Sequence, residues 1–411
     1  MTAGASPTRP AVHQVLATLG YGDAIGNEVM GIRAVLREAG YASEIFVESA
    51  DPRLEPLTYD YRDLIDVSRP DNILIHHFSL GSRASRIAYA LPDQMVLVYH
   101  NITPPEYFLG VHEDLVRLCY TGRRELSAYV NRCDLALGDS EFNRQELEGF
   151  GFPRTGVLPV VPNLAHLDET PDRTLVSEFD DERTNILFVG RLIPSKRIED
   201  VIRCYQAYRI RHQPEARLLL VGAYGGFESY LATLHHLIAT LRVKDVHIMG
   251  HISNAELTAC YDVADLFLSA SEHEGFCVPL VEAFRKRIPV LAYAAAAVPG
   301  TMDGAGVLYE TKDPRHVASL MDTVLSNPAL EREIIRGQDA ALDRLLEQDF
   351  AGLLLDVVDR VRRGPRLPHP EVRWDFWQRF AEWERLEELR LYRPSAYKAL
   401  PFAPGERGEN P

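Results

Sequence analysis

The sequence is short of the features that mark metal-binding, redox-active and membrane-spanning proteins. None of its five cysteines forms a Cys-x-x-Cys pair, so zinc and thioredoxin-type interpretations have no support. Their odd number and irregular spacing are typical of a reduced cytosolic protein. Residues 1–10 lack an apolar signal core. No run approaches about 18 uninterrupted apolar residues, so we expect no transmembrane helix.

The charge balance limits the partners that this chain binds. The 411 residues carry a formal net charge of −15, which argues against general binding to nucleic acid. Lysine is scarce, with five among 44 basic residues, so the position of each lysine carries information. A hydrophobic share of 46% over this length suggests two or three soluble domains that need no disulfide or metal for stability.

Apolar, β-rich runs alternate with amphipathic helical patterns along most of the chain. In the first part, strands are expected at 13–18, 44–48, 73–76, 96–100, 135–139 and 156–159, and helices at 26–39, 113–130 and 141–148. In the second part, strands are expected at 186–190, 217–222, 246–250, 266–270 and 290–293. Several strands are continuously apolar, which is typical of parallel strands covered on both faces.

This alternation predicts an α/β protein with two Rossmann-like, doubly wound domains facing across a cleft. A stretch rich in proline and acidic residues, 160–182, interrupts the pattern and is interpreted as the connection between domains. We therefore expect an N-terminal domain at 1–165, a C-terminal domain at 166–370 and a helical segment at 371–411. Ligands of such sheets bind at the carboxyl ends of strands, which makes the cleft the natural site.

Two basic residues stand where the first strand of the second domain ends. Gly190 ends that strand, Arg191 follows it, and Lys196 precedes a helix expected to begin near Arg197. A guanidinium and an ammonium beside a helix N-terminus suit the oxygens of a phosphate. The alternative is a pair of solvated surface cations at a turn.

A later strand of the same domain leads into Glu274-Gly275-Phe276-Cys277-Val278-Pro279-Leu280-Val281-Glu282. Its two acids are too far apart to share one helical face, so Glu274 is expected in the loop and Glu282 inside a helix. That arrangement aims an acid, backbone N–H groups and a helix N-terminus at one point, which suits a ligand with hydroxyls and phosphates. The alternative is that both acids only favour the helix start or face solvent.

Taken in order, these two segments resemble the signature of retaining GT-B glycosyltransferases of the GT4 type, and the resemblance covers nearly the whole chain. The first half carries Tyr99-His100-Asn101 and Asp139-Ser140-Glu141-Phe142-Asn143 where the family has a histidine and a serine-led helix start. The resemblance implies a GT-B fold, with a C-terminal helix crossing back to the first domain. It also implies a hexosyltransferase that retains the anomeric configuration of the transferred sugar.

The resemblance assigns roles to the matching residues. Arg191 and Lys196 would hold the donor's pyrophosphate, Glu282 would accept hydrogen bonds from ribose hydroxyls, and Glu274 would contact the donor sugar. His100 would reach that sugar from the first domain and completes the implied catalytic set. The implied donor-binding set is Gly26, Gly190, Arg191, Lys196, Ile252, Glu274, Gly275, Phe276, Cys277, Val278 and Glu282.

The reaction implied by the resemblance develops negative charge on the departing diphosphate, so electrostatic stabilisation of that group is the main requirement. Enzymes that use a metal for this often show Asp-x-Asp, and no two aspartates of this chain stand two positions apart. We therefore expect neither a metal nor another cofactor, with Arg191, Lys196 and helix N-termini in place of the cation. Glu274 resembles neither a clear nucleophile nor a clear base.

The implied donor is GDP-mannose or a UDP-hexose, and the acceptor is a glycan, a lipid-linked molecule or a small molecule bound by the first domain. The expected location is the cytoplasm, with weak peripheral contact at the inner membrane face left open. Two alternatives stay open: an inactive nucleotide-sugar-binding homologue, and a synthase or phosphorylase of the same fold. A phosphorylase would need a lysine for pyridoxal phosphate, and none has a recognisable context.

The chain departs from the family pattern at Cys277, where a small residue, commonly glycine, is usual. A cysteine there restricts the backbone of the turn. The segment 294–300 also lacks the glycine pair and the acid often found in the family.

Other histidines and the aromatic tail offer further candidates. His76 and His77 end a predicted strand and are interpreted as structural, with a position in the cleft as the alternative. His235 and His236 lack a second pair of metal ligands, and His273 could touch the acceptor. Trp374, Trp377 and Trp383 fall in the C-terminal segment and predict either packing across the first domain or a membrane-surface helix.

Overall fold

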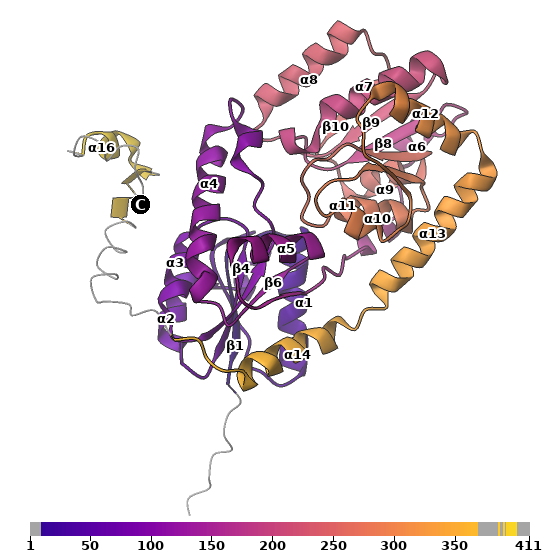
Figure 1. Ribbon diagram of the computed structural model, residues 1–411. Helices are drawn as coiled ribbons and strands as arrows, with labels where there is room; N and C mark the ends of the chain where they lie inside the picture. Colours follow the sequence, from indigo (N-terminus) through magenta and orange to yellow (C-terminus); the bar gives the residue numbers. More distant parts are fainter. Residues whose placement is uncertain (1–9, 369–384, 387–388, 391, 401–411) are drawn as a thin grey trace, which may run out of the picture.

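The computed structural model describes residues 10–368, 385–386, 389–390 and 392–400. Two lobes lie side by side, and each is built on one parallel sheet with helices packed around it (Figure 1). This confirms the predicted pair of Rossmann-like domains. The predicted packing of 371–411, including the three tryptophans, falls mainly outside the described residues.

The first sheet has the order β3-β2-β1-β4-β5-β6-β7. Its strands are β1 (Val12–Leu19), β2 (Ile45–Ala50), β3 (Tyr59–Asp60), β4 (Ile73–Phe78), β5 (Gln94–Tyr99), β6 (Leu135–Gly138) and β7 (Thr155–Val157). Every residue of β4 and β5 is buried, because helices cover both faces of the sheet. The two-residue strand β3 was not predicted.

The second sheet has the order β10-β9-β8-β11-β12-β13, so the chain reverses direction across the sheet between β8 and β11. Its strands are β8 (Asn185–Val189), β9 (Arg217–Val221), β10 (Val246–Gly250), β11 (Leu266–Ser269), β12 (Val290–Tyr293) and β13 (Val307–Tyr309). In this strand order, ligands bind outside the carboxyl ends of the two central strands.

The helices alternate with the strands and confirm the predicted βα rhythm. The first lobe contains α1 (Ala24–Glu38), α2 (Leu64–Val67), α3 (Arg83–Ala90), α4 (Glu113–Ala128) and α5 (Glu141–Phe150). The chain continues through α6 (Arg173–Phe179), α7 (Ile198–Arg211), α8 (Glu228–Leu241), α9 (Asn254–Asp262), α10 (Val278–Arg285), α11 (Val298–Met302), α12 (Pro314–Leu325), α13 (Pro328–Leu346), α14 (Phe350–Arg363) and α16 (Pro394–Lys398). Among the described residues, no helix combines the length and apolar character needed to cross a membrane.

The segment 160–182 contains more structure than a simple connection. Helix α6 lies inside it, and Leu175 and Phe179 of this helix pack into the core of the second lobe. Leu167, in a short 3-10 turn before α6, joins the same core. The chain therefore enters the second lobe early in this segment.

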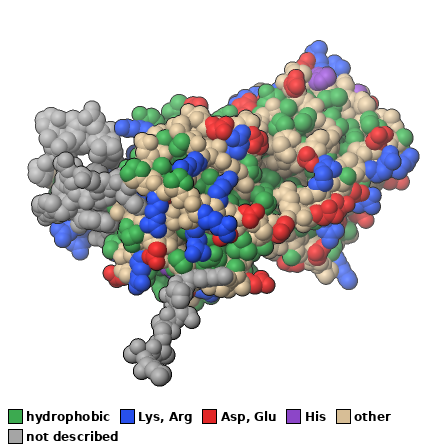
Figure 2. All heavy atoms as spheres, turned by 60° about the horizontal axis from the view of Figure 1, so that its bottom comes forward, with side chains coloured by type: hydrophobic (Ala, Val, Ile, Leu, Met, Phe, Trp, Pro, Cys, Tyr) green, Lys and Arg blue, Asp and Glu red, His purple; other side chains and the backbone are tan. Residues whose placement is uncertain are grey.

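Helix α14 returns from the second lobe to the first, although the expected boundary at 370 places it in the second domain. Leu354, Val357, Val358 and Val361 pack against a core formed by β1, β4, β5 and α1. The side chain of Gln94 also donates to the carbonyl of Val361 at 3.0 Å. Figure 2 brings the side of α14 forward and shows basic side chains gathered on the first lobe.

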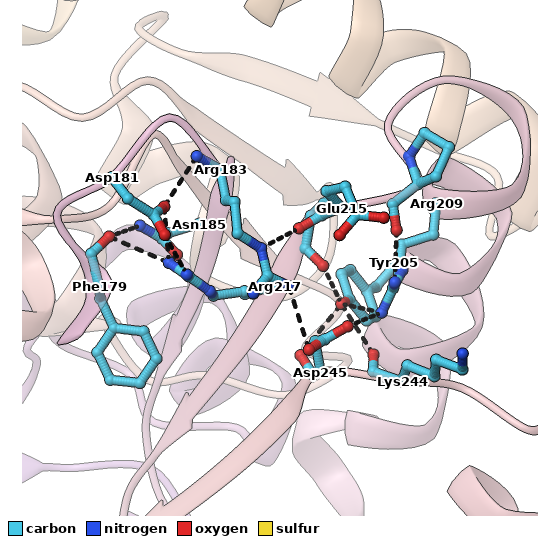
Figure 3. A network of polar contacts seen from close by, with 12 residues as sticks. Phe179, Asp181, Arg183, Asn185, Tyr205, Arg209, Glu215, Arg217, Lys244 and Asp245 are labelled. Atoms are coloured by element: carbon cyan, nitrogen blue, oxygen red, sulfur yellow. Dashed lines mark hydrogen bonds and ion pairs between the residues drawn. The ribbon is translucent and has the colours of Figure 1, made fainter.

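A polar network ties the amino ends of the second-lobe strands together (Figure 3). Arg217 begins β9, is buried, and pairs with Asp181, while Arg183 lies 3.1 Å from Asp245. The hydroxyl of Tyr205 donates to backbone carbonyls on the same side. The network fixes the entry of the strands, at the opposite end of the sheet from the carboxyl ends that carry Arg191 and Glu274.

Candidate active site

The two central strands of the second sheet deliver the predicted basic and acidic segments to one place. Strands β8 and β11 pair directly, with Leu266 beside Ile186 and Phe267 beside Leu187. Arg191 follows the carboxyl end of β8, and Glu274 follows that of β11. Both therefore stand at the point where the strand order reverses, which is the ligand-binding position of such sheets.

The turn after β8 presents the basic residues. Gly190 has φ of +151°, a conformation that side chains rarely adopt, and the chain then forms a short 3-10 turn, Pro194–Lys196, before α7. The exposed Arg191 guanidinium lies over the ring of Phe227, 5.6 Å from its centre. The Lys196 ammonium forms an ion pair with the carboxylate of Glu274. The pair joins the two predicted segments directly.

The segment after β11 places Glu274 in a loop and Glu282 in α10, as predicted. Glu274 is buried to 8% exposure, and α10 begins at Val278 with Pro279 in its first turn. Cys277 caps this helix with φ of +79°, in the left-handed region that favours glycine. The position where the chain departs from the family pattern thus has a strained backbone.

A cavity of about 340 Å³ opens between the lobes at this point. It brings together nine of the predicted residues: His100, Gly190, Arg191, Lys196, Glu274, Gly275, Phe276, Cys277 and Val278. The first lobe adds Ala24, Ile25, Glu28, Asp139 and Val160 to its lining. The cations Arg191 and Lys196 thus share a cavity with His100 and the carboxyl groups of Glu28 and Asp139 from the first lobe.

Three predicted residues lie outside the lining of this cavity. Glu282 is buried in α10, where it accepts a hydrogen bond from Tyr261 at 2.6 Å and lies 3.0 Å from Nε2 of His166. Ile252 packs beside the core of the second lobe. Gly26 stands close to its own loop, since an added Cβ would lie 2.0 Å from the carbonyl oxygen of Gly20. Close packing of α1 on that loop is therefore one reason for glycine there.

In the first lobe, a chain of hydrogen bonds runs through Gln14, His77 and His100 and forms the polar wall of the cavity. The donors and acceptors of this chain can be assigned. The amide nitrogen of Gln14 donates to the carbonyl of Val29 at 3.0 Å, which turns its oxygen toward His77. Nε2 of His77 must then donate to that oxygen at 2.9 Å, so Nδ1 of His77 is an acceptor. Nε2 of His100 donates to it at 2.8 Å.

The other nitrogen of His100 faces two carboxylates. Nδ1 lies 3.7 Å from Asp139 and 3.9 Å from Glu28. Burial lowers the pKa of His100, but the contacts with Asp139 and Glu28 outweigh burial and raise it above the ordinary value. Burial also lowers the pKa of His77 well below the usual range. Of the two rings, His100 is therefore the one that binds an additional proton more readily.

The same wall contains groups that could bind a metal ion. Ligand atoms of Glu28, His77 and His100 lie within 4.8 Å of one another. The two imidazole rings lie end to end, with planes 9° apart and centres 5.1 Å apart, so the two nitrogens point at each other. A metal bound by both would need the rings to turn, because lone pairs that face each other do not converge on a third point. The arrangement fits a shared proton better than a metal ion.

Loops from both lobes meet beside the cavity. Asn101, with φ of +71°, donates to Asn143 at 2.7 Å and accepts a hydrogen bond from His273 of the second lobe. Burial lowers the pKa of His273 to about 4, so its ring is neutral. Ser140 caps α5 by accepting from the backbone of Asn143, which confirms the serine-led helix start.

Two residues of this wall were not predicted as site residues: Glu28 had no expected role, and His77 was interpreted as structural. Both carried a usable signal. Glu28 interrupts the apolar stripe formed by Ile25, Val29 and Ile32 on the first helix, and a charged residue inside such a stripe has to be explained. His77 and its neighbour His76 are the polar residues of a strand that is otherwise apolar.

Known glycosyltransferases resemble this chain over part of its length. Residues 174–339 match the family model described as "Glycosyl transferases group 1". A D-inositol 3-phosphate glycosyltransferase of Kineococcus radiotolerans is 31% identical over 222 residues, covering 49% of this chain and 51% of that protein. An O-antigen chain mannosyltransferase B of Escherichia coli is 25% identical over 233 residues, covering 54% and 58%. The chain thus spans about half the length of the curated relatives it matches.

Solved structures share the complete two-lobe architecture. A sucrose-phosphate synthase of Thermosynechococcus elongatus superposes with a TM-score of 0.64 at 17% identity, covering 86% of this chain and 98% of the other. The Anabaena protein HepE, solved with UDP-glucose, gives 0.65 at 15% identity, covering 85% and 99%. At these identities the likeness concerns the fold alone. The second lobe therefore belongs to the group 1 glycosyl transferase family, in a chain that has the two-domain GT-B fold.

Proposed function

We propose that this protein is a retaining hexosyltransferase that moves a sugar from a nucleoside diphosphate to a hydroxyl acceptor without a metal ion. The observation that carries the proposal is the meeting of Arg191, Lys196 and Glu274 at the point where the strand order reverses. Two cations and the N-terminus of α10 suit a pyrophosphate. The matching family and the transferases among the relatives support the same reaction class.

In this proposal the second lobe binds the donor. Lys196 would exchange part of its ion pair with Glu274 for a phosphate oxygen, and Arg191 would hold a second oxygen. Glu274 would then be free to accept hydrogen bonds from the sugar. Glu282 accepts from Tyr261 and His166, so ribose hydroxyls would share or replace the His166 contact. Ile252 would lie toward the nucleobase.

In the proposed reaction, the anomeric carbon exchanges one C–O bond for another, and the acceptor hydroxyl loses its proton. The bond from this carbon to the diphosphate oxygen breaks, and its electrons stay on the diphosphate, where Arg191 and Lys196 stabilise the charge. The acceptor oxygen bonds to the same carbon and loses its proton, which the diphosphate oxygen can accept. Attack from the face that the diphosphate leaves retains the configuration.

The donor class can be identified with ligand-induced stabilisation. We expect UDP, GDP and their hexose conjugates to raise the melting temperature to different extents, because a ligand that binds only the folded state stabilises it. GDP-mannose and UDP-hexoses are the first compounds to test, and no shift with any of them would contradict the proposal. Turnover after exhaustive chelation should equal that of the untreated protein. A loss that a divalent cation restores would refute metal independence.

A further inference from the structure

Glu28 is a buried acid whose hydrogen-bonding capacity is unused by its neighbours. It lies in α1, is 6% exposed, and contributes to the lining of the cavity between the lobes. Within the described part of the chain, neither of its side-chain oxygens has a hydrogen-bond partner. Burying such a group without a partner costs free energy, so a carboxyl kept in this state points to a missing partner.

The neighbouring groups are already committed elsewhere. His100 uses Nε2 for His77 and lies closer to Asp139 than to Glu28 through Nδ1. Asp139 also accepts a hydrogen bond from the side chain of Asn143. Asp139 therefore has a hydrogen-bond donor in Asn143, which Glu28 lacks. The contacts of His100 Nδ1 with Asp139 at 3.7 Å and with Glu28 at 3.9 Å are both longer than a hydrogen bond.

The contacts of the two His100 nitrogens also bear on the role expected for this residue. The family resemblance implied that His100 contacts the donor sugar, but both of its nitrogens already face protein groups, His77 on one side and Asp139 and Glu28 on the other. Although His100 also lines the cavity, it therefore supports the wall as a positioning residue. The acid that lines the cavity with unused oxygens is Glu28.

We propose that Glu28 binds a sugar hydroxyl of the substrate, so that the first lobe holds the sugar while Arg191 and Lys196 hold the phosphates; this rests on the proposed glycosyl transfer. Burial raises the pKa of Glu28 to about 7, with the nearby His100 opposing the effect and Asp139 adding to it. Near neutral pH the carboxyl is thus available in both forms. It accepts hydrogen bonds when ionised and also donates one when protonated, which matches a hydroxyl group.

Replacing Glu28 by leucine separates a substrate-binding role from a structural one. Leucine fills similar space, favours the helix and removes the unpartnered acid. We expect Glu28→Leu to raise the melting temperature by about 2–6 °C and to lower sugar transfer about 10- to 100-fold. Glu38→Leu, the same change at an exposed position of α1, serves as the control and should alter neither quantity.

A glutamine at position 28 tests the chemistry of the contact. Its amide offers a donor and an acceptor in the same place, so we expect Glu28→Gln to transfer sugar well above Glu28→Leu. Equal loss in both variants would overturn the assignment to a hydroxyl. A lower melting temperature in Glu28→Leu would also overturn the proposal, because the acid would then have a stabilising partner within the protein. Full transfer activity in Glu28→Leu would overturn it as well.

Two further measurements identify which hydroxyl is bound and separate this proposal from the proposed function. If Glu28 holds the donor sugar, Glu28→Leu slows donor hydrolysis without acceptor; if it holds the acceptor, only transfer falls. Calorimetry should show equal binding of bare UDP or GDP in the wild type and in Glu28→Leu. Absence of nucleotide binding to the wild type would refute the proposed function, while the melting comparison would still decide whether Glu28 lacks a structural partner.

Discussion

Gly222 provides a sharp test of how the second sheet positions Arg191. It follows β9 directly and has φ of +149°, and its N–H donates to the carbonyl of Gly250 at 2.9 Å. The N–H of Gly190 donates to the carbonyl of Val221 at 2.9 Å, so backbone hydrogen bonds join the ends of β8, β9 and β10. An alanine Cβ at Gly222 would lie 1.9 Å from the carbonyl oxygen of Gly190 and 3.2 Å from the nitrogen of Arg191.

The size of the effect follows from this geometry. No rotamer relieves a clash between Cβ and a backbone oxygen, so the Gly190–Arg191 backbone has to move by roughly 1 Å to restore van der Waals contact. The backbone conformation costs about 1–3 kcal/mol for a residue other than glycine, and a weakened ladder hydrogen bond adds about 1 kcal/mol. We expect Gly222→Ala to lower the free energy of unfolding by about 2–4 kcal/mol.

Catalysis should suffer as well, because Arg191 moves with this backbone. A displacement of about 1 Å in a positioning group can cost about 10²-fold in rate. Urea unfolding gives the stability, and release of nucleoside diphosphate gives the rate. Gly225→Ala is the matched control, since no atom lies within 4 Å of its added Cβ. If Gly222→Ala matched this control in stability and rate, the reasoning would be wrong.

Two further predictions concern stability. Leu354→Ala in α14 should destabilise the protein by about 2–5 kcal/mol in urea unfolding, because this buried side chain closes the core of the first lobe; an effect equal to that of the exposed Leu353→Ala would contradict the packing of α14 on that lobe. Burial lowers the pKa of His13 to about 4 and that of His76 to about 3. Both rings are neutral when folded, so their contribution is present above the ordinary pKa of 6.5 and is lost as the pH falls toward 4. The urea midpoint should drop over that range, and less so in His76→Gln; parallel curves would refute the assignment.

Local sequence patterns were sufficient to locate most strands and helices along the chain. Continuous apolar runs such as 96–100 mark strands that helices cover on both faces, and β5 lies at Gln94–Tyr99. The patterns failed for β3 and β13, which have two and three residues and leave some of them exposed. Strands that short carry too few side chains for a period of two to be recognised.

Those local patterns could not predict packing between segments that are far apart in the sequence. The amphipathic sequence of α14 indicates that one face is buried, but not which lobe buries it. The side chain of Gln94 bonding to Val361 joins residues more than half the chain apart. Such a contact depends on the path of the whole chain, and so does the assignment of α14 to a lobe.

The candidate site likewise has one part that the sequence predicts and one part that it does not. The order of Arg191, Lys196 and Glu274 along the chain was enough to place them together, because parallel strands deliver their carboxyl ends to one edge. The wall of Gln14, His77 and His100 depends instead on β1, β4 and β5 being neighbours in the sheet. That order is not written in any one segment, so His77 could be seen as polar in a buried strand but not as the partner of His100.

The central claim is that fixed cations at the carboxyl end of β8 stabilise the departing diphosphate. Single-turnover transfer by Lys196→Ala tests it most directly, with Lys286→Ala, a lysine that pairs with Asp262 away from the cavity lining, as the control. For a variant whose melting curve shows that it is folded, we expect the rate constant to fall about 10²- to 10³-fold. A folded Lys196→Ala protein that transfers sugar within about threefold of the Lys286→Ala control would contradict the account.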